Sequence, residues 1–207
     1  ESALDAAVTG GQNTAIGKNA LSANTSGTNN TVVGANALDA NTTRHDNVAI
    51  GYRALTNQSI ADQNTAIGSN SMAANQTGEY NVAVGYDSLA SNTTASSNTA
   101  IGKDALNSNT TASNNTAVGA DALQANTTGA NNTAVGESAL DQNTTGSHNA
   151  AVGTDSLKQN TTGSNNVAFG HRALEENTTA NNNTGIGYEA LRENTTGTNN
   201  VAVGIGC

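Results

Sequence analysis

The chain has 207 residues, a formal net charge of −9, 2% aromatic residues, and neither Trp nor Pro. This composition excludes an ordinary globular core built on large side chains, and an acidic chain without a basic patch argues against nucleic-acid binding. No apolar run is long enough to cross a bilayer, so we expect no membrane insertion. Low hydrophobicity alone is typical of disorder, but here the apolar residues recur at fixed intervals, which indicates an ordered repeat.

A glycine closes each unit of a repeat whose period is 17 residues throughout. We number the unit positions from 1 to 17, and the closing glycines are Gly17, Gly34, Gly51, Gly68, Gly85, Gly102, Gly119, Gly136, Gly153, Gly170, Gly187 and Gly204. A short fixed period is the signature of a solenoid. The sequence therefore predicts one repeat domain over residues 1–207, made of twelve coils stacked in register, as a segment of a longer fibre. Glu1 to Leu4 already match the later coils, so we expect no signal peptide there.

The first part of the unit is predicted to hold a short strand. Position 3 is Ala or Ser, and position 4 is Leu in every coil except for Met72. We expect the leucine to be buried at the centre of this strand. Cys207 falls in the position 3 column, which favours a small core residue, with a free thiol for cross-linking as the alternative.

Positions 7 to 10 read Asn-Thr-Thr followed by Gly or Ala in most coils, which predicts a turn. The same residues form Asn-x-Thr/Ser sequons, so they are candidate glycan acceptors in a secreted protein. These are Asn24, Asn41, Asn75, Asn92, Asn109, Asn126, Asn143, Asn160, Asn177 and Asn194. The alternative is that the repeat simply requires this turn. The two threonine columns also suggest that the chain binds ice, although the side chains of adjacent residues point to different faces.

Positions 13 to 17 are predicted to form a β-strand that ends at the glycine. Residues at positions 14 and 16 point one way, and those at 13 and 15 point the other. We expect Ile or Val at position 16 to join the core, and the small residue at position 15 to allow chains to approach one another. Position 13 is always asparagine, which predicts an amide ladder along the axis. The ladder residues are Asn13, Asn30, Asn47, Asn64, Asn81, Asn98, Asn115, Asn132, Asn149, Asn166, Asn183 and Asn200.

The strand motif resembles a known family. Asn13–Gly17 and Asn64–Gly68 read Asn-Thr-Ala-Ile-Gly, which resembles the head repeat of trimeric autotransporter adhesins of the YadA type. The longer unit, Asn114–Gly119 continuing to Asn126–Gly129, also looks like repeats of phage tail-fibre-like proteins. The resemblance implies an all-β, left-handed parallel β-roll that assembles as a homotrimer on a cell or virion surface. The chain departs from the adhesin pattern in its longer period and its Asn-Thr-Thr turn.

No catalytic, metal or cofactor site is predicted. The three histidines, His45, His148 and His171, share no unit position and lie in distant coils, where a rod would keep them apart. Recurring carboxylates at position 2 are expected to form a solvated face, because the spacing of a calcium-binding repeat is missing. Contact residues are expected where coils differ. These are Tyr52, Tyr80, Tyr86 and Tyr188, and the irregular fourth coil with Gln58 to Ala61.

Together these patterns predict a structural protein and not an enzyme. We expect a rigid segment of an extracellular fibre or adhesin that associates with itself, as a homotrimer or fibre, and contacts a cell-surface or matrix receptor. The alternative is a surface-binding solenoid that recognises ice or glycans. Either function places the chain outside the cell, on a cell surface or on a virion.

Overall fold

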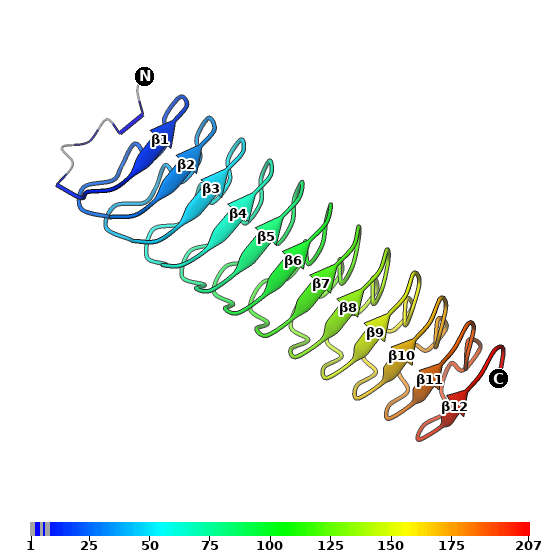
Figure 1. The fold of residues 1–207 in the computed structure, drawn as a ribbon. Coiled ribbons are helices and arrows are strands. Elements are labelled where there is room, and N and C mark those ends of the chain that lie inside the picture. Colours follow the sequence, from blue (N-terminus) through cyan, green and yellow to red (C-terminus); the bar gives the residue numbers. More distant parts are fainter. Residues whose placement is uncertain (1–2, 5, 7–8) are drawn as a thin grey trace.

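The computed structural model describes residues 3–4, 6 and 9–207. Glu1 and Ser2, which the sequence predicts to be in register with the later coils, lie outside these residues. The described chain is an all-β parallel solenoid, as predicted, and contains no helix. Figure 1 shows the strands side by side in one sheet, with β1 and β12 at opposite ends of a rod.

Each coil contributes one strand of three residues, at unit positions 14 to 16. The strands are β1 Thr14–Ile16, β2 Thr31–Val33, β3 Val48–Ile50, β4 Thr65–Ile67, β5 Val82–Val84, β6 Thr99–Ile101, β7 Thr116–Val118, β8 Thr133–Val135, β9 Ala150–Val152, β10 Val167–Phe169, β11 Thr184–Ile186 and β12 Val201–Val203. Consecutive strands pair in parallel with identical register, for example Ala117 with Ala134. The unbroken period therefore becomes an unbroken ladder of equivalent positions.

The closing glycine is required for two reasons, and both act at Gly136. Its φ is +136°, a backbone conformation that side chains rarely adopt. In addition, a Cβ atom placed there would lie 2.6 Å from the carbonyl carbon of Gly153 in the next coil. The coils stack backbone on backbone at this corner, which leaves no room for a side chain.

The core is made of Leu at position 4 and Ala at position 15, and this corrects the sequence prediction. Leu123 and Ala134 are fully buried, whereas Val135 at position 16 is exposed. The predicted alternation along the strand is right, but positions 14 and 16 point outward and position 15 points inward. The position 15 column is thus inside its own chain and cannot be the predicted contact between chains.

The predicted strand around position 4 is also wrong. Leu123 lies in a turn with φ of 52°, and every leucine or methionine of this column has a similar positive value. The turn still connects the coils, because the Leu123 amide donates a hydrogen bond of 3.0 Å to the carbonyl of Ala139. A left-handed conformation costs free energy in a non-glycine residue, and here it directs the leucine side chain across the interior towards the alanine column.

Candidate functional site

The exposed faces of the rod, over the residues that the structure describes, are the candidate site. Among the described residues, no group of three His, Cys, Asp or Glu side chains is placed to hold a metal ion. His45, His148 and His171 lie in different coils, and His171 stacks on Tyr188 with ring centroids 5.4 Å apart. A hollow at one end of the rod is lined by Leu191, Arg192 and Cys207 among others. The described residues include no helix of the length and apolar character that crossing a membrane requires.

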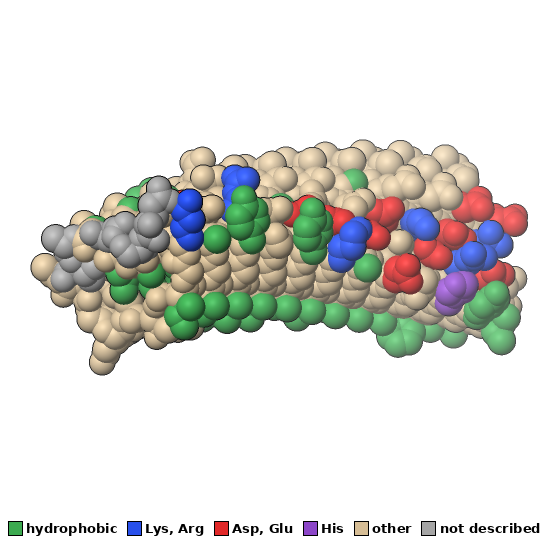
Figure 2. All heavy atoms as spheres, turned by 90° about the horizontal axis from the view of Figure 1, so that it is seen from above, with side chains coloured by type: hydrophobic (Ala, Val, Ile, Leu, Met, Phe, Trp, Pro, Cys, Tyr) green, Lys and Arg blue, Asp and Glu red, His purple; other side chains and the backbone are tan. Residues whose placement is uncertain are grey.

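An apolar stripe runs the length of the rod along the outward face of the strands. We call it the strand stripe and define it as the residues at unit positions 14 and 16 of all twelve coils. Ile101 is 40% exposed, Val167 40% and Phe169 57%, and the remaining members are at least partly exposed. Figure 2 shows a continuous row of hydrophobic side chains along the edge of the rod that carries the strands. The stripe contains Ile, Val, Phe, Thr and Ala, but no charged residue.

Two asparagine columns bind the coils together beneath this face. At position 13 the main bond differs from the predicted amide ladder, because the side-chain oxygen accepts from the next backbone. Asn132 N donates to Asn115 Oδ1 at 2.9 Å, and Asn132 Nδ2 donates to the Gly146 carbonyl at 2.8 Å. At position 7 the amides do pair with each other, since Asn143 Nδ2 donates to Asn126 Oδ1 at 2.8 Å. These asparagines are structural.

Burial of the position 7 asparagines bears on whether the sequons can carry glycans in the folded rod. Nine of the sequon asparagines are fully buried, namely Asn24, Asn41, Asn75, Asn92, Asn109, Asn126, Asn143, Asn160 and Asn177. Asn126 Nδ2 donates to the Gly129 carbonyl at 3.0 Å and to Asn109 Oδ1 at 2.9 Å. A glycan on this nitrogen would need both the space and the protons that the fold uses. Burial and these hydrogen bonds argue against glycan attachment at the nine residues and favour the alternative that the repeat requires this turn, while Asn194 is half-buried.

The two threonine columns have different roles. Thr127 Oγ1, at position 8, donates to the Thr144 carbonyl of the next coil at 2.9 Å, and the same bond recurs along much of the rod. Thr128, at position 9, is exposed. Hydroxyls at position 8 are therefore engaged in holding the coils together. The exposed threonines therefore form a single column, at position 9.

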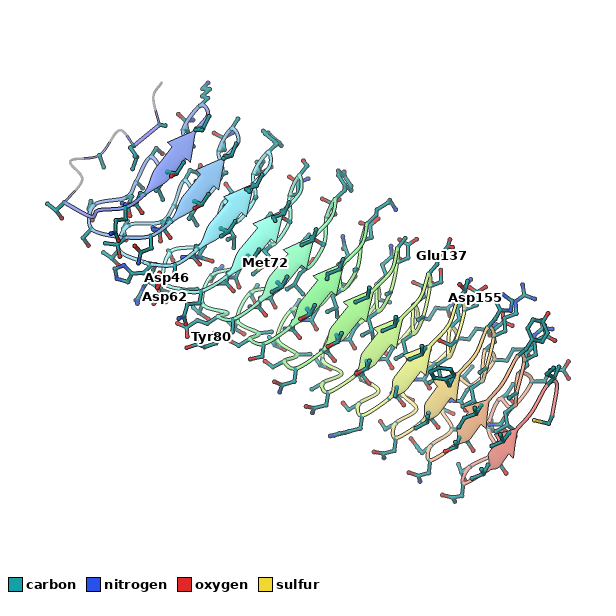
Figure 3. The ribbon with its side chains drawn as sticks, viewed as in Figure 1. Asp46, Asp62, Met72, Tyr80, Glu137 and Asp155 are labelled. Carbon is teal, nitrogen blue, oxygen red and sulfur yellow. The ribbon has the colours of Figure 1, made fainter. Side chains whose placement is uncertain are left out.

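A patch that differs from the repeat lies on the edge opposite Glu137 and Asp155. Figure 3 shows Asp46, Asp62 and Tyr80 together on this edge, in the region of the irregular fourth coil. The backbone amide of His45 donates to Asp62 Oδ1 at 2.7 Å. Arg44 Nη1 also lies 3.7 Å from Asp62 Oδ2, so this carboxylate is already engaged, whereas the Tyr80 side chain is exposed.

Charged residues gather at the other end of the chain, at positions 2 and 5 of the last coils (Figure 2). Lys158 Nζ lies 2.7 Å from Asp155 Oδ1, and this hydrogen bond raises the pKa of the Lys158 ammonium. Arg192 Nε lies 2.8 Å from Glu175 Oε2 in the preceding coil. At position 2, the Arg172 guanidinium lies 3.9 Å from Asp155 and 3.8 Å from Glu189, so ion pairs form both within a coil and between adjacent coils. Such partly exposed pairs each contribute little to stability.

No family model, curated protein or solved structure matches the chain. The exposed faces of the rod are therefore the basis for its function. Sequence reasoning missed the most prominent of them, the strand stripe, because it assigned position 16 to the core. The sequence did contain a signal for this face. Leu at position 4 and Ala at position 15 can fill a thin interior by themselves, which leaves Ile or Val at position 16 outside.

Proposed function

We propose that this chain is a rigid structural segment of an extracellular fibre or adhesin, in which copies associate along the strand stripe. The observation that carries the proposal is the stripe itself. Contiguous exposed apolar surface in a soluble protein marks a site of association. This surface runs from β1 to β12, about 53 Å at a strand spacing of about 4.8 Å, and no charge interrupts it.

The width of the stripe favours a homotrimer. Only two residues of each strand point outward, so the apolar surface is long and narrow. A narrow line is covered well when several parallel rods place it on a common axis, as in a closed cyclic assembly. A broad two-sided contact would instead bring in the polar turns on either side. A trimer also agrees with the family that the strand motif resembles.

The mechanical role follows from the uniform coils. Backbone hydrogen bonds connect successive coils. The two asparagine columns add to these bonds, except that Gln58 interrupts the position 7 column next to Asn41. Stacked repeats create extended surfaces with regular spacing. The net charge of −9 favours solubility of such a long particle. Contact with a cell-surface or matrix receptor would use the positions that vary between coils.

Surface binding is the second candidate function. The exposed Tyr52, Tyr86 and Tyr188 share position 1 and favour stacking against sugar rings. The exposed threonines at position 9 are the feature that supports ice binding. Binding to a panel of polysaccharides tests the first possibility, and thermal hysteresis tests the second. Either result with an isolated, unassembled chain would favour this function over the fibre.

Charge placed on the strand stripe tests the main proposal. We expect Ile101→Asp to abolish association measured by light scattering, because a carboxylate would be buried against an apolar partner. Thr94→Asp is the matched control, since it adds the same charge to an exposed position of the same coil, away from the stripe. A parent chain that is monomeric, or an Ile101→Asp variant that assembles as well as the control, would contradict the proposal.

A further inference from the structure

Two residues break the pattern of the strand stripe, and they lie on adjacent strands. Position 16 is Ile or Val in every coil except the tenth, where it is Phe169. Position 14 is Thr or Val in every coil except the ninth, where it is Ala150. In the paired strands β9 and β10, Ala150 is opposite Val167, and Val152 is opposite Phe169. The largest and the smallest residues of the stripe are therefore diagonal neighbours on one outward face.

This pairing places a projecting ring beside a position of reduced side-chain volume, which we call the recess. Phe169 is 57% exposed, so most of its ring stands above the surface of its own chain. Ala150 removes the side-chain volume that Thr or Val supplies in the other coils. Paired changes of opposite size are typical of packed surfaces, where total volume must be conserved. A face that met only water would not require a small residue next to a large one.

A uniform stripe would define the position of a second copy poorly. All the coils apart from the ninth and tenth have Ile or Val at position 16 and Thr or Val at position 14. Sliding one rod past another by one coil would replace each contact with an almost equivalent contact, and would lose only the overlap of a single coil at each end. Registers that are nearly equal in free energy are prone to slippage. A single distinct feature is enough to select one of them.

We propose that Phe169 and Ala150 set the axial register between copies, with Phe169 of one chain packing in the recess over Ala150 of the next. The occupant of the recess is thus a second copy of this chain, aligned in parallel and without offset. The proposal rests on association along the strand stripe. It adds the element that makes all copies in an assembly start and end at the same height.

Disulfide pairing between copies tests this register. Cys207 is the only cysteine, so Cys207→Ser gives a cysteine-free background. Two differently tagged chains, one with Val135→Cys and the other with Val118→Cys, carry a reporter thiol at position 16 of neighbouring coils. They are refolded together and oxidised. We expect disulfides between identical reporters to predominate, because unlike reporters meet only after a shift of one coil.

Substitutions at the two residues should remove this preference. With Phe169→Val, which restores the usual residue of the column, the share of identical pairs is expected to fall towards the even split of unbiased pairing. Ala150→Thr, which fills the recess with the usual residue, should have the same effect. Ile186→Val is the control, because it makes a similar change at position 16 of the next coil and should leave the preference intact.

The outcomes separate this proposal from the proposed function. An assembled parent chain with an even split, with no interchain disulfide, or with a preference that survives Phe169→Val would overturn the register proposal and leave association in place. If Phe169 only covers Ala150 within its own chain, Ala150→Thr will lower thermal stability without changing the pairing preference, which also overturns it. A parent chain that stays monomeric by light scattering would overturn both.

Discussion

Asn41 Oδ1 is buried without a hydrogen-bond partner, because the next coil has Gln58 where all the later coils have asparagine. In a regular coil, the asparagine Nδ2 donates both to the position 10 carbonyl and to the preceding asparagine. Gln58 Nε2 donates to the Ala61 carbonyl at 2.8 Å, and no bond from it reaches Asn41. Its oxygen still accepts from Asn75 at 3.2 Å, so the ladder is broken on one side only.

Gln58→Asn should therefore stabilise the rod. The shorter side chain restores the regular ladder and gives Asn41 Oδ1 its donor, and an unsatisfied buried acceptor costs about 1–3 kcal/mol. We expect the free energy of unfolding in urea to rise by about 1 kcal/mol. Part of the gain is offset, because Gln58 Oε1 loses the hydrogen bond that it accepts from Asn64 Nδ2 at 3.1 Å. Asn126→Gln is the reciprocal control and should lower stability. A loss of stability in Gln58→Asn would contradict this account of the break.

Gly136→Val should disrupt the rod, whereas Ser138→Ala should be nearly neutral. The valine would have to adopt a φ near the +136° of Gly136, and its Cβ would overlap the backbone of Gly153. We expect a loss of about 4 kcal/mol or more, in the range of severe backbone strain and overpacking. Ser138, two residues further on, already carries a Cβ atom at its φ of 54°, and alanine adds no atom to it. Equal midpoints of thermal unfolding for the two variants would contradict the stacking described here.

Much of this fold follows from the sequence because the repeat restricts it so tightly. The fixed spacing of Gly136 and its equivalents predicts the in-register stack, and the invariant asparagine column predicts a ladder. The direction of the strand could not be predicted in the same way. Alternation places Ala134 and Val135 on opposite faces, but it does not say which face is inside. That choice depends on how far Leu123 reaches across the coil, which is a property of the closed turn.

Local propensity also failed at position 4 for a physical reason. A left-handed conformation is typical of Gly, Asn and Asp, and this signal is present at Asn114 and Asp121, whose φ values are 63° and 58°. Leu123 gives no such signal, because leucine rarely adopts this conformation. Burial of its side chain and hydrogen bonds to the neighbouring coils overcome the local preference. Only a stack of coils contains these interactions.

Asp141→Asn should stabilise the chain at neutral pH. Burial raises the pKa of the Asp141 carboxyl above its ordinary 3.8, although Lys158 nearby lowers it. The folded state therefore binds this proton more tightly than the unfolded chain does. Its contribution to stability is fully present below pH 3.8, and is lost as the pH rises through the higher folded-state pKa. Asparagine resembles the protonated acid, so its advantage should appear as the pH rises.

The pH dependence is measured by thermal unfolding of both chains from acid to neutral pH. The difference in unfolding temperature between Asp141→Asn and the parent should increase with pH and then level off. Glu137→Gln makes the same change in net charge at an exposed position of the same coil, and controls for overall charge. A difference that shrinks as the pH rises would show that the ionised Asp141 is favoured by the fold.

Neighbouring threonines of one turn should respond differently to the same substitution. Thr127→Val removes the 2.9 Å hydrogen bond from Oγ1 to the Thr144 carbonyl, so we expect a loss of about 1 kcal/mol in the free energy of unfolding. Thr128→Val should be close to neutral, because the Thr128 side chain is exposed.

Thr128→Val also removes the sequon at Asn126. If the parent chain is expressed in a secretory host, peptide mapping should find no glycan at Asn126, which is fully buried. A glycan at Asn126 of the folded parent would contradict the buried ladder, because that nitrogen already donates two hydrogen bonds inside the rod.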